Sequence, residues 1–435
     1  MTPYEVLLSE SQERMLIIVR RGQQNRVKEI FEKWDLPYAE AGAVTADGMM
    51  RVLDHGKVEV EIPAKELAEE APIYQRAVAV PPPPSLLRFE EIPEADPRES
   101  LLRLLSDPTV ASKNWIYRQY DHTVRAGTVV PPGSDAAVFF VREAGKFLAA
   151  TCDCNSAYCR LDPREGAKIA VAEAARNLIC AGAIPLAVTD NLNFGNPYRP
   201  ENFWQLRESV EGLAEACRRF NTPVVGGNVS LYNESPAGSV DPTPTVGMVG
   251  LIEKERWITR QGFLHENDPV WLVGGLGDEM GGSLYLRSVH GLKIGLPPRL
   301  DYDQALAVHQ FLAEAIRSGW VQSAHDCSDG GLAVALAESC VSGGMKTGAQ
   351  ISIGAHGRRT DERLFNESQS RILFSSGPGL TAELQHLAER HKVDLIELGQ
   401  VGGHKLQITM GKQVIEWGVD ELFDSWYFSI ERSIA

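Results

Sequence analysis

The sequence predicts an α+β protein with two complete modules, residues 101–260 and 261–435, preceded by the tail of an earlier module in residues 1–75. Strand and helix patterns alternate from residue 101 onward and then restart, as expected for a mixed fold assembled from repeated units. A polar hexamer also occurs twice, as ESQERM at residues 10–15 and as ESQSRI at residues 367–372. The second copy has most of a module in front of it, and the first has nine residues.

The similarity between the two copies extends beyond the hexamer. Residues 29–67 and 386–422 both read as a helix end, a short strand, a G-x-V step, two strands joined by a glycine-containing turn, and a final (K/D)EL. A match of this length indicates a duplicated domain rather than a short solenoid repeat. We expect the first copy to lack its leading portion, because the gene begins mid-domain or because an N-terminal half is missing. Its strands would be prone to aggregation unless they are covered.

A proline-rich stretch, residues 76–100, separates the tail from the modules. It contains four consecutive prolines, Pro81 to Pro84, and adds Pro93 and Pro97. Proline favours an extended, semi-rigid backbone, so this stretch is predicted to be a linker.

In the first module, short apolar runs predict strands and helical spacing predicts helices. The predicted strands are residues 135–141, 146–153, 185–192, 222–232 and 245–253. The predicted helices are residues 162–183, which Gly182 is placed to stop, and residues 201–220.

The second module repeats this alternation. A strand runs through glycines into a helix over residues 268–286, and a helix is predicted over residues 303–321. Residues 323–340 read as a tight polar turn that opens another helix, and the second hexamer closes the unit.

Composition excludes several classes of function. The chain is 43% hydrophobic and 23% charged, as in an ordinary globular protein, and its net charge of −15 argues against binding nucleic acid. No apolar stretch could span a bilayer and no signal peptide precedes the opening MTPYEV, so no membrane contact is expected. Seven cysteines, an odd number, fit reduced thiols in the cytoplasm. Cys152, Cys154 and Cys159 have no second ligand pair to complete a zinc site, so we interpret them as small buried hydrophobes.

Polar residues at predicted strand ends are the first candidates for chemistry. Asp190 in TDNLNFGNP could hold Mg²⁺ or a nucleotide, although Asx capping of a polar turn explains it equally well. In VVGGNVSLYNE, Gly227 would let the backbone approach a phosphate, and Asn228 and Ser230 offer oxygens to a cation or a substrate. A bulge within the strand is the structural alternative.

Two further candidates are acidic. Asp135 and Asp153 lie near strand termini and could share Mg²⁺. HDCSDGG, residues 325–331, opens a helix whose positive end suits an anion, but N-capping by Ser328 or Asp329 is our preferred interpretation.

The hexamers place Glu10, Ser11 and Gln12 at the start of a predicted strand, where they could hydrogen-bond a polar ligand. The corresponding residues 367–369 could instead be structural, with Arg371 anchoring a loop.

These motifs, in this order, resemble the large synthetase subunit of phosphoribosylformylglycinamidine synthase, in the aminoimidazole ribonucleotide synthetase superfamily. The resemblance runs through SESQERM, DNLNFGNP, GGNVSLYNE, HDCSDGGLAVALAE and ESQSRI and covers essentially the whole chain. It implies the tail of one synthetase C-terminal domain followed by an N-terminal-type domain (101–260) and a C-terminal-type domain (261–435). The chain would be roughly the C-terminal three-fifths of the short bacterial form.

The resemblance implies a ligase of purine biosynthesis that uses ATP and Mg²⁺. ATP would phosphorylate the amide oxygen of formylglycinamide ribonucleotide, and glutamine-derived ammonia would displace the phosphate to give the amidine. An amide oxygen is a poor leaving group until it is phosphorylated, and Mg²⁺ and positioned donors stabilise such a transfer. The implied partners are a missing or separately encoded N-terminal half, a glutaminase subunit and a small bridging subunit.

Position by position, the resemblance implies substrate contacts for Glu10, Ser11, Gln12 and Ser230. The first hexamer would then be the functional copy, and the second its structural or auxiliary-site counterpart.

The resemblance also implies ATP contacts for Asp190 and Gly227 and a Mg²⁺ contact for Asn228. Asp135 and Asp153 would serve an auxiliary nucleotide site, which holds ADP structurally in some members of the family.

One departure bears on activity. Where the family's first repeat carries two catalytic histidines, the stretch TCDCNSAYCRLDP holds Asp153 and Asn155, as expected of the second repeat, and Cys154 stands where that repeat usually has glycine. The first-repeat Lys, Glu, Asp and His residues have no counterpart, so we assign no catalytic residue to this chain and predict that it does not turn over alone.

Two alternatives remain at this stage. A non-catalytic nucleotide-binding scaffold would have the same motifs. A stand-alone superfamily enzyme, such as a thiamine monophosphate kinase or a selenophosphate synthetase, would have no use for the tail in residues 1–75, and the reactive N-terminal cysteine of the selenium enzyme is absent.

Overall fold

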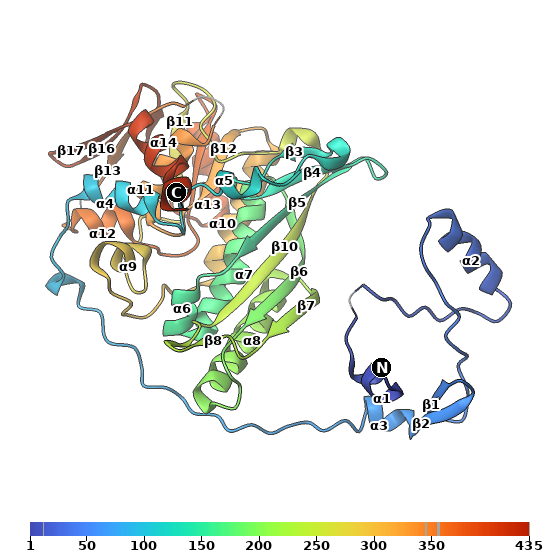
Figure 1. Cartoon of the computed structure of the whole chain (residues 1–435). Coiled ribbons are helices and arrows are strands. Elements are labelled where there is room, and N and C mark those ends of the chain that lie inside the picture. Colours follow the sequence, from blue (N-terminus) through green and yellow to red (C-terminus); the bar gives the residue numbers. More distant parts are fainter. Residues whose placement is uncertain (12, 344–345, 355–356, 435) are drawn as a thin grey trace. The chain divides into compact units, whose positions relative to one another are not determined.

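The computed structural model of the chain describes residues 1–11, 13–343, 346–354 and 357–434. It divides into two compact units, which we call the N-terminal segment (residues 1–75) and the main unit (residues 76–435) (Figure 1). Within the described part, no helix is both long and apolar enough to cross a bilayer.

The N-terminal segment is built from short elements around an antiparallel hairpin. These elements are α1 (Pro3–Leu8), α2 (Gln24–Lys33), β1 (Met49–Asp54), β2 (Lys57–Pro63) and α3 (Ala64–Ala68). The hairpin pairs β1 with β2. None of the described residues of this segment is buried, so it has no hydrophobic core of its own.

The main unit begins with an extended stretch through the four prolines and then forms short helices. They are η1 (Phe89–Glu91), α4 (Pro97–Ser106), α5 (Asn114–Tyr117) and η2 (Val124–Ala126). Asp96 caps α4 by accepting the backbone N–H of Glu99 at 2.9 Å. Leu101, Leu104 and Leu105 of α4 are fully buried in the core of the C-terminal half.

The first sheet has the strand order β3-β4-β5-β10-β6-β7. Its strands are β3 (Thr128–Val130), β4 (Ala137–Val141), β5 (Lys146–Asp153), β6 (Ile184–Asn193), β7 (Val224–Ser230) and β10 (Thr243–Ile252), and a small hairpin of β8 (Glu234–Ser235) and β9 (Gly238–Ser239) follows β7. Neighbouring strands are antiparallel except β6 and β7, which are parallel.

Helices pack on one face of the first sheet. They are α6 (Ser156–Leu161), α7 (Pro163–Cys180) and α8 (Pro200–Phe220). Helix α7 is buried along most of its length, because its many alanines let it lie close to β10 and α8. The other side of the sheet, which we call the open face, carries the exposed apolar side chains of Phe139, Ile184, Leu186 and Val249.

The second sheet has the strand order β12-β14-β11-β15-β13-β16-β17. Its strands are β11 (Pro269–Val273), β12 (Val321–Asp326), β13 (Ala349–Ile353), β14 (Ile372–Ser376), β15 (Leu395–Val401), β16 (Lys405–Met410) and β17 (Gln413–Gly418). The accompanying helices are η3 (Glu255–Trp257), α9 (Leu284–His290), α10 (Tyr302–Arg317), α11 (Gly331–Val341), α12 (Thr360–Phe365), α13 (Thr381–His391), α14 (Val419–Tyr427) and α15 (Ser429–Ile434).

Both faces of the second sheet are covered. Leu272 of β11 belongs to a core shared with α4, α9, α11 and α14, whereas the adjacent Trp271 belongs to a core shared with α10 and α13. This alternation is expected of a strand buried on both faces. Ile179 and Cys180 at the end of α7 join the second of these cores, so α7 connects the two sheets.

The duplicated regions keep the order of helix, hairpin and final helix. The short strand expected between the helix and the hairpin of the first copy is wrong: residues 36–45 form no strand, whereas the second copy has β15 there. After the second hexamer come β14, α13, β15, β16, β17 and α14, and after the first come α2, β1, β2 and α3. The expected strand after the first hexamer is wrong: residues 15–19 form no strand, and Met15 is 87% exposed. Strand β14 pairs with β11 and β12 on its two sides, whereas no strand precedes the first hexamer among the described residues.

His309 gives the main unit a testable response to acid. Its ring packs 5.6 Å from that of Phe220 between α10 and α8, and burial, with a smaller effect of Arg176, lowers its pKa from 6.5 to about 3. Between these two pKa values the imidazole is protonated in the unfolded chain and neutral in the folded chain. Its contribution to the free energy of unfolding is therefore fully present above pH 6.5 and is lost as the pH falls toward 3. We expect His309→Phe to recover about 3 kcal/mol of this loss in urea unfolding at pH 4 relative to pH 7.

The exposed His386 on α13 provides the matched control, and His386→Phe should leave the pH dependence unchanged. An unaltered acid profile in His309→Phe would contradict the assignment of a neutral buried imidazole.

Candidate functional site

The parallel strands β6 and β7 bring the predicted nucleotide and metal contacts together. Their register places Asp190 opposite Gly227, Asn191 opposite Asn228, and Asn193 opposite Ser230. The two residues of each pair lie more than thirty positions apart in the sequence, and the parallel pairing makes them neighbours. Since β7 is an edge strand, one side of this group is free of a further strand.

Asp190 and Gly227 fit one another closely. A Cβ atom at position 227 would lie 2.7 Å from Cγ of Asp190 and 2.9 Å from its backbone oxygen, so only glycine leaves room for the carboxylate. Partial burial raises the pKa of the Asp190 carboxyl. The pair therefore forms a carboxylate beside bare backbone, an arrangement that suits a polar ligand lying against the strand.

Asn228 and Ser230 face the other side of the sheet. Successive residues of a strand alternate, so these two share a face with Asn191 and Asn193 rather than with Asp190. Asn228 is exposed, whereas the Ser230 hydroxyl donates to Oδ1 of Asn233 at 3.2 Å. The carboxamide oxygens of Asn191 and Asn228 are hard, neutral ligands of the kind that Mg²⁺ accepts along with phosphate oxygens and water.

The first hexamer lies in the N-terminal segment. Glu10 and Ser11 are exposed there, and Gln12 lies outside the described residues. Their assignment to a substrate stays a prediction.

The second hexamer is buried and structural. Glu367 accepts the backbone N–H groups of Gly330 at 2.7 Å and Leu284 at 2.8 Å, and the Tyr158 hydroxyl donates to it. Burial, together with the charge of Asp329, raises the pKa of Glu367 to about 7. Arg371 is fully buried and donates to three backbone carbonyls, which is the loop-anchoring role expected for it.

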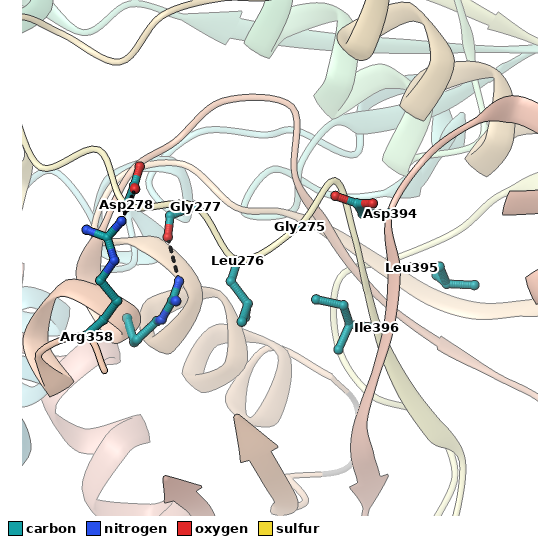
Figure 2. Close-up of a pocket in the computed structure, with 9 residues that line it drawn as sticks. Gly275, Leu276, Gly277, Asp278, Arg358, Asp394, Leu395 and Ile396 are labelled. Atoms are coloured by element: carbon teal, nitrogen blue, oxygen red, sulfur yellow. Dashed lines mark hydrogen bonds and ion pairs between the residues drawn. The ribbon is translucent and has the colours of Figure 1, made fainter. Parts of the chain in front are cut away.

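Ser368 of the same hexamer holds a glycine-rich loop. Its hydroxyl accepts the backbone N–H groups of Asp278 at 3.1 Å and Glu279 at 3.0 Å. This loop lines a cavity of about 490 Å³, shown in Figure 2. Arg358, which pairs with Asp278 at 2.8 Å, and Asp394 stand at its rim, so the cavity carries charges of both signs.

Asp135 makes contacts between the two sheets. Its carboxylate lies 3.1 Å from Nδ1 of His325 and accepts the backbone N–H of Asp326 at 2.9 Å, and Glu338 lies 3.1 Å from Nε2 of the same ring. Burial alone would lower the pKa of His325, but the two carboxylates raise it well above its ordinary value. Both oxygens of Asp135 are engaged, so binding Mg²⁺ would require these contacts to break.

Asp153 belongs to a buried acidic network around Arg176. Asp153 accepts a hydrogen bond from Asn177 at 3.1 Å. Arg176 forms a two-point ion pair with Asp326, lies 3.7 Å from Glu173, and donates to Gln369 at 3.3 Å.

Carboxylates outnumber cations in this network. Burial, reinforced by the neighbouring negative charges, raises the pKa values of Asp153 and Glu173. Across the described residues, no three His, Cys, Asp or Glu side chains are arranged to hold a metal ion. The assignment of Asp135 and Asp153 to Mg²⁺ stays a prediction.

Arg176 was not among the predicted site residues. The available signal was a charged pair, Glu173 and Arg176, three positions apart in the stretch 169–176, whose other residues are all apolar. A buried arginine needs several acceptors, and these come from Asp326 and Gln369 in the other half of the unit.

The comparisons with known proteins agree with this arrangement. AIR synthase related protein, N-terminal domain, matches residues 133–252, and the corresponding C-terminal domain matches residues 1–55 and 265–411. The chain belongs to the AIR synthase related protein family. The double match of the C-terminal domain confirms the duplication predicted from the two hexamers.

Two curated relatives illustrate the similarity. The chain is 47% identical over its whole length to phosphoribosylformylglycinamidine synthase subunit PurL of Moorella thermoacetica, covering 60% of that protein. It is also 47% identical, over 98% of its length, to the PurL subunit of Alkaliphilus metalliredigens, covering 58% of it. The chain thus spans about three-fifths of the length of the curated relatives that it matches.

Solved structures show the same fold. Thermotoga maritima PurL complexed with AMPPCP aligns with 93% of this chain and 58% of its own length, with a TM-score of 0.59 and 23% identity. The same protein complexed with FGAR aligns with 75% of this chain and 54% of its own length, with a TM-score of 0.59 and 18% identity. These likenesses confirm the predicted α+β architecture.

The fit between Gly227 and Asp190 predicts a position-specific cost. Gly227→Ala should push the carboxylate aside and destabilise the main unit by about 1–3 kcal/mol in urea unfolding. The neighbouring Gly226 is the matched control, because a Cβ there meets nothing within 4 Å. Equal stabilities of Gly226→Ala and Gly227→Ala would show that the strands do not pair in this register.

The buried ion pair predicts a larger effect. Arg176→Met should leave Asp326 buried without its partner and cost about 3–5 kcal/mol of unfolding free energy. Arg432→Met removes an exposed pair with Asp424 and should leave the unfolding midpoint unchanged. A comparable, small change in both variants would refute the central role given to Arg176.

Proposed function

We propose that this chain forms part of a PurL-type synthase that amidates formylglycinamide ribonucleotide in purine biosynthesis, with ATP and glutamine-derived ammonia. The observation that carries the proposal is the 47% identity to PurL along the entire chain. Asp190 and Gly227 lie on one face of the paired strands β6 and β7, and Asn228 and Ser230 lie on the other face of the same pair. Bound Mg²⁺ and ATP would activate the amide by phosphorylation of its oxygen. Nucleotide-complexed structures of Thermotoga maritima PurL support the ATP part of the proposal.

The residues of this chain would bind and orient rather than exchange protons. Asp190 beside Gly227 would accept hydrogen bonds from the nucleotide, and the Asn228 oxygen would face the cation. Ser230, with Glu10, Ser11 and Gln12, would contact the ribonucleotide. No catalytic acid or base is assigned to the chain, so we infer that it is inactive alone.

The open face supports a requirement for a further polypeptide half. Phe139 lies opposite Leu148, which lies opposite Leu251, which in turn lies opposite Ile184, so one apolar row crosses four strands. Such a row on the surface of a sheet favours coverage by another protein surface. The N-terminal segment, none of whose described residues is buried, would also gain from such coverage.

The proposal also includes two partner subunits and a cytoplasmic location. Ammonia would come from a glutaminase subunit joined through a small bridging subunit. All seven cysteines are free, which fits the reducing cytoplasm.

A complementation assay tests the proposal. The chain would be purified alone and also mixed with the portion of Moorella thermoacetica PurL that it does not match, and ADP release would be followed with formylglycinamide ribonucleotide and ammonia. We expect no turnover by the chain alone and substrate-dependent turnover by the mixture. No gain on mixing, with nucleotide binding retained, would favour a non-catalytic nucleotide-binding scaffold instead.

Asp190 gives the residue-level prediction. Asp190→Asn should weaken ATP binding by the mixture about 10–100-fold, because a charged hydrogen-bond acceptor is lost. Asp303→Asn is the control, since that carboxylate is 90% exposed and pairs with Arg219. Isothermal titration with a non-hydrolysable ATP analogue measures both, and unchanged affinity in Asp190→Asn would remove this residue from the site.

A further inference from the structure

Two thiols flank the first turn of helix α6. Asn155 is the N-cap, and its side chain accepts the backbone N–H groups of Ala157 and Tyr158, each at 3.1 Å. Cys154 therefore occupies the position before the cap, and Cys159 the fourth helical position. Side chains at these two positions commonly pack against each other across the start of a helix. Here they are both cysteines, and the neighbouring Cys154 side chain, together with burial, raises the pKa of the Cys159 thiol.

Helix α7 holds Cys159 in place. Cys159 is fully buried, and a Cβ atom on Gly166 would lie 2.8 Å from its sulfur atom, so the absence of a side chain at 166 lets α7 press against the thiol. Cys154 is only partly buried and remains accessible to small reagents. One thiol of the pair is thus reachable and the other is fixed beside it.

The third cysteine of the cluster is separate. Cys152 lies on β5 opposite Gly247, and alternation along the strand directs it away from Asp153, whose carboxylate contacts Asn177 of α7. It is exposed. Of the three nearby cysteines, Cys154 and Cys159 occupy the two positions that flank the first turn of α6.

We propose that Cys154 and Cys159 form a reversible disulfide across the cap of α6. Low-molecular-weight disulfides of the glutathione class are the oxidant. The Cys154 thiol loses its proton and attacks one sulfur of the oxidant, which forms a mixed disulfide and releases one thiol. Cys159 then loses its proton and attacks the Cys154 sulfur, which forms the intramolecular disulfide and releases the second thiol. Two electrons and two protons pass to the oxidant, which becomes two thiols.

The disulfide would act on the junction between the two sheets. It encloses Asn155, whose Nδ2 donates to Asp329 at 2.9 Å, and Tyr158, whose hydroxyl donates to Glu367. Both partners belong to the C-terminal half of the main unit. Oxidation therefore fixes the turn that carries two contacts between the halves, and reduction frees it.

Peptide mapping of the full chain provides the test. The reduced protein would be incubated with oxidised glutathione, alkylated and digested with trypsin, which releases residues 147–160 as one peptide containing all three cysteines. We expect this peptide to lose two hydrogen masses, to keep a single alkylation site at Cys152, and to regain three sites after dithiothreitol. Hydrogen exchange of the backbone amides of residues 155–160 should slow on oxidation.

Three variants make the outcome decisive. Cys152→Ser should retain the full change, whereas Cys154→Ser should abolish it. Cys159→Ala should stop at a glutathione adduct on Cys154. A link between Cys152 and Cys154, an adduct confined to Cys152, or a fully reduced peptide under oxidant would each overturn the proposal.

Discussion

The ion pair between Arg176 and Asp326 joins the two sheets of the main unit at a point where neither side chain reaches solvent. Arg176 comes from α7, the helix that covers the first sheet, and Asp326 from β12 of the second sheet. Removing a charged group from water costs several kcal/mol per ion, so a buried charge is stable only when its hydrogen-bonding partners are placed with good geometry. The polar residues around Arg176, among them Asp153 and Gln369, belong to the same buried network and depend on this ion pair for their positions.

The same constraint separates structural polar residues from ligand-facing ones. Glu367, Ser368 and Arg371 are buried, and most of their hydrogen bonds are with backbone groups, so the second hexamer stabilises the fold. Asp190, Asn228 and their neighbours lie on an edge pair of strands with few internal partners. Their polar groups remain available to a ligand, which is why the proposed ATP and substrate contacts fall there.

Much of the fold could be predicted because the signals were local. Helices α7 and α8 and strands β4, β5 and β10 follow from apolar periodicity, and Gly182, with φ of 86°, ends α7 as its position predicted. The duplication was also visible, since two stretches of similar order are recognisable without any contact information. The strand predicted at residues 15–19 is absent because a strand needs neighbours: β14 has β11 and β12, and no described strand precedes the first hexamer.

The residues of the candidate site could be predicted from the sequence, but their arrangement in space could not. The sequence by itself determined which polar residues follow strands, where glycine interrupts them, and that one domain occurs twice. Only the tertiary structure decided that Asp190 meets Gly227, that Asn228 and Ser230 face the opposite side, and that Arg176 has acceptors in the other half. These are contacts between residues far apart in the chain, and they depend on strand register and helix packing rather than on local preference.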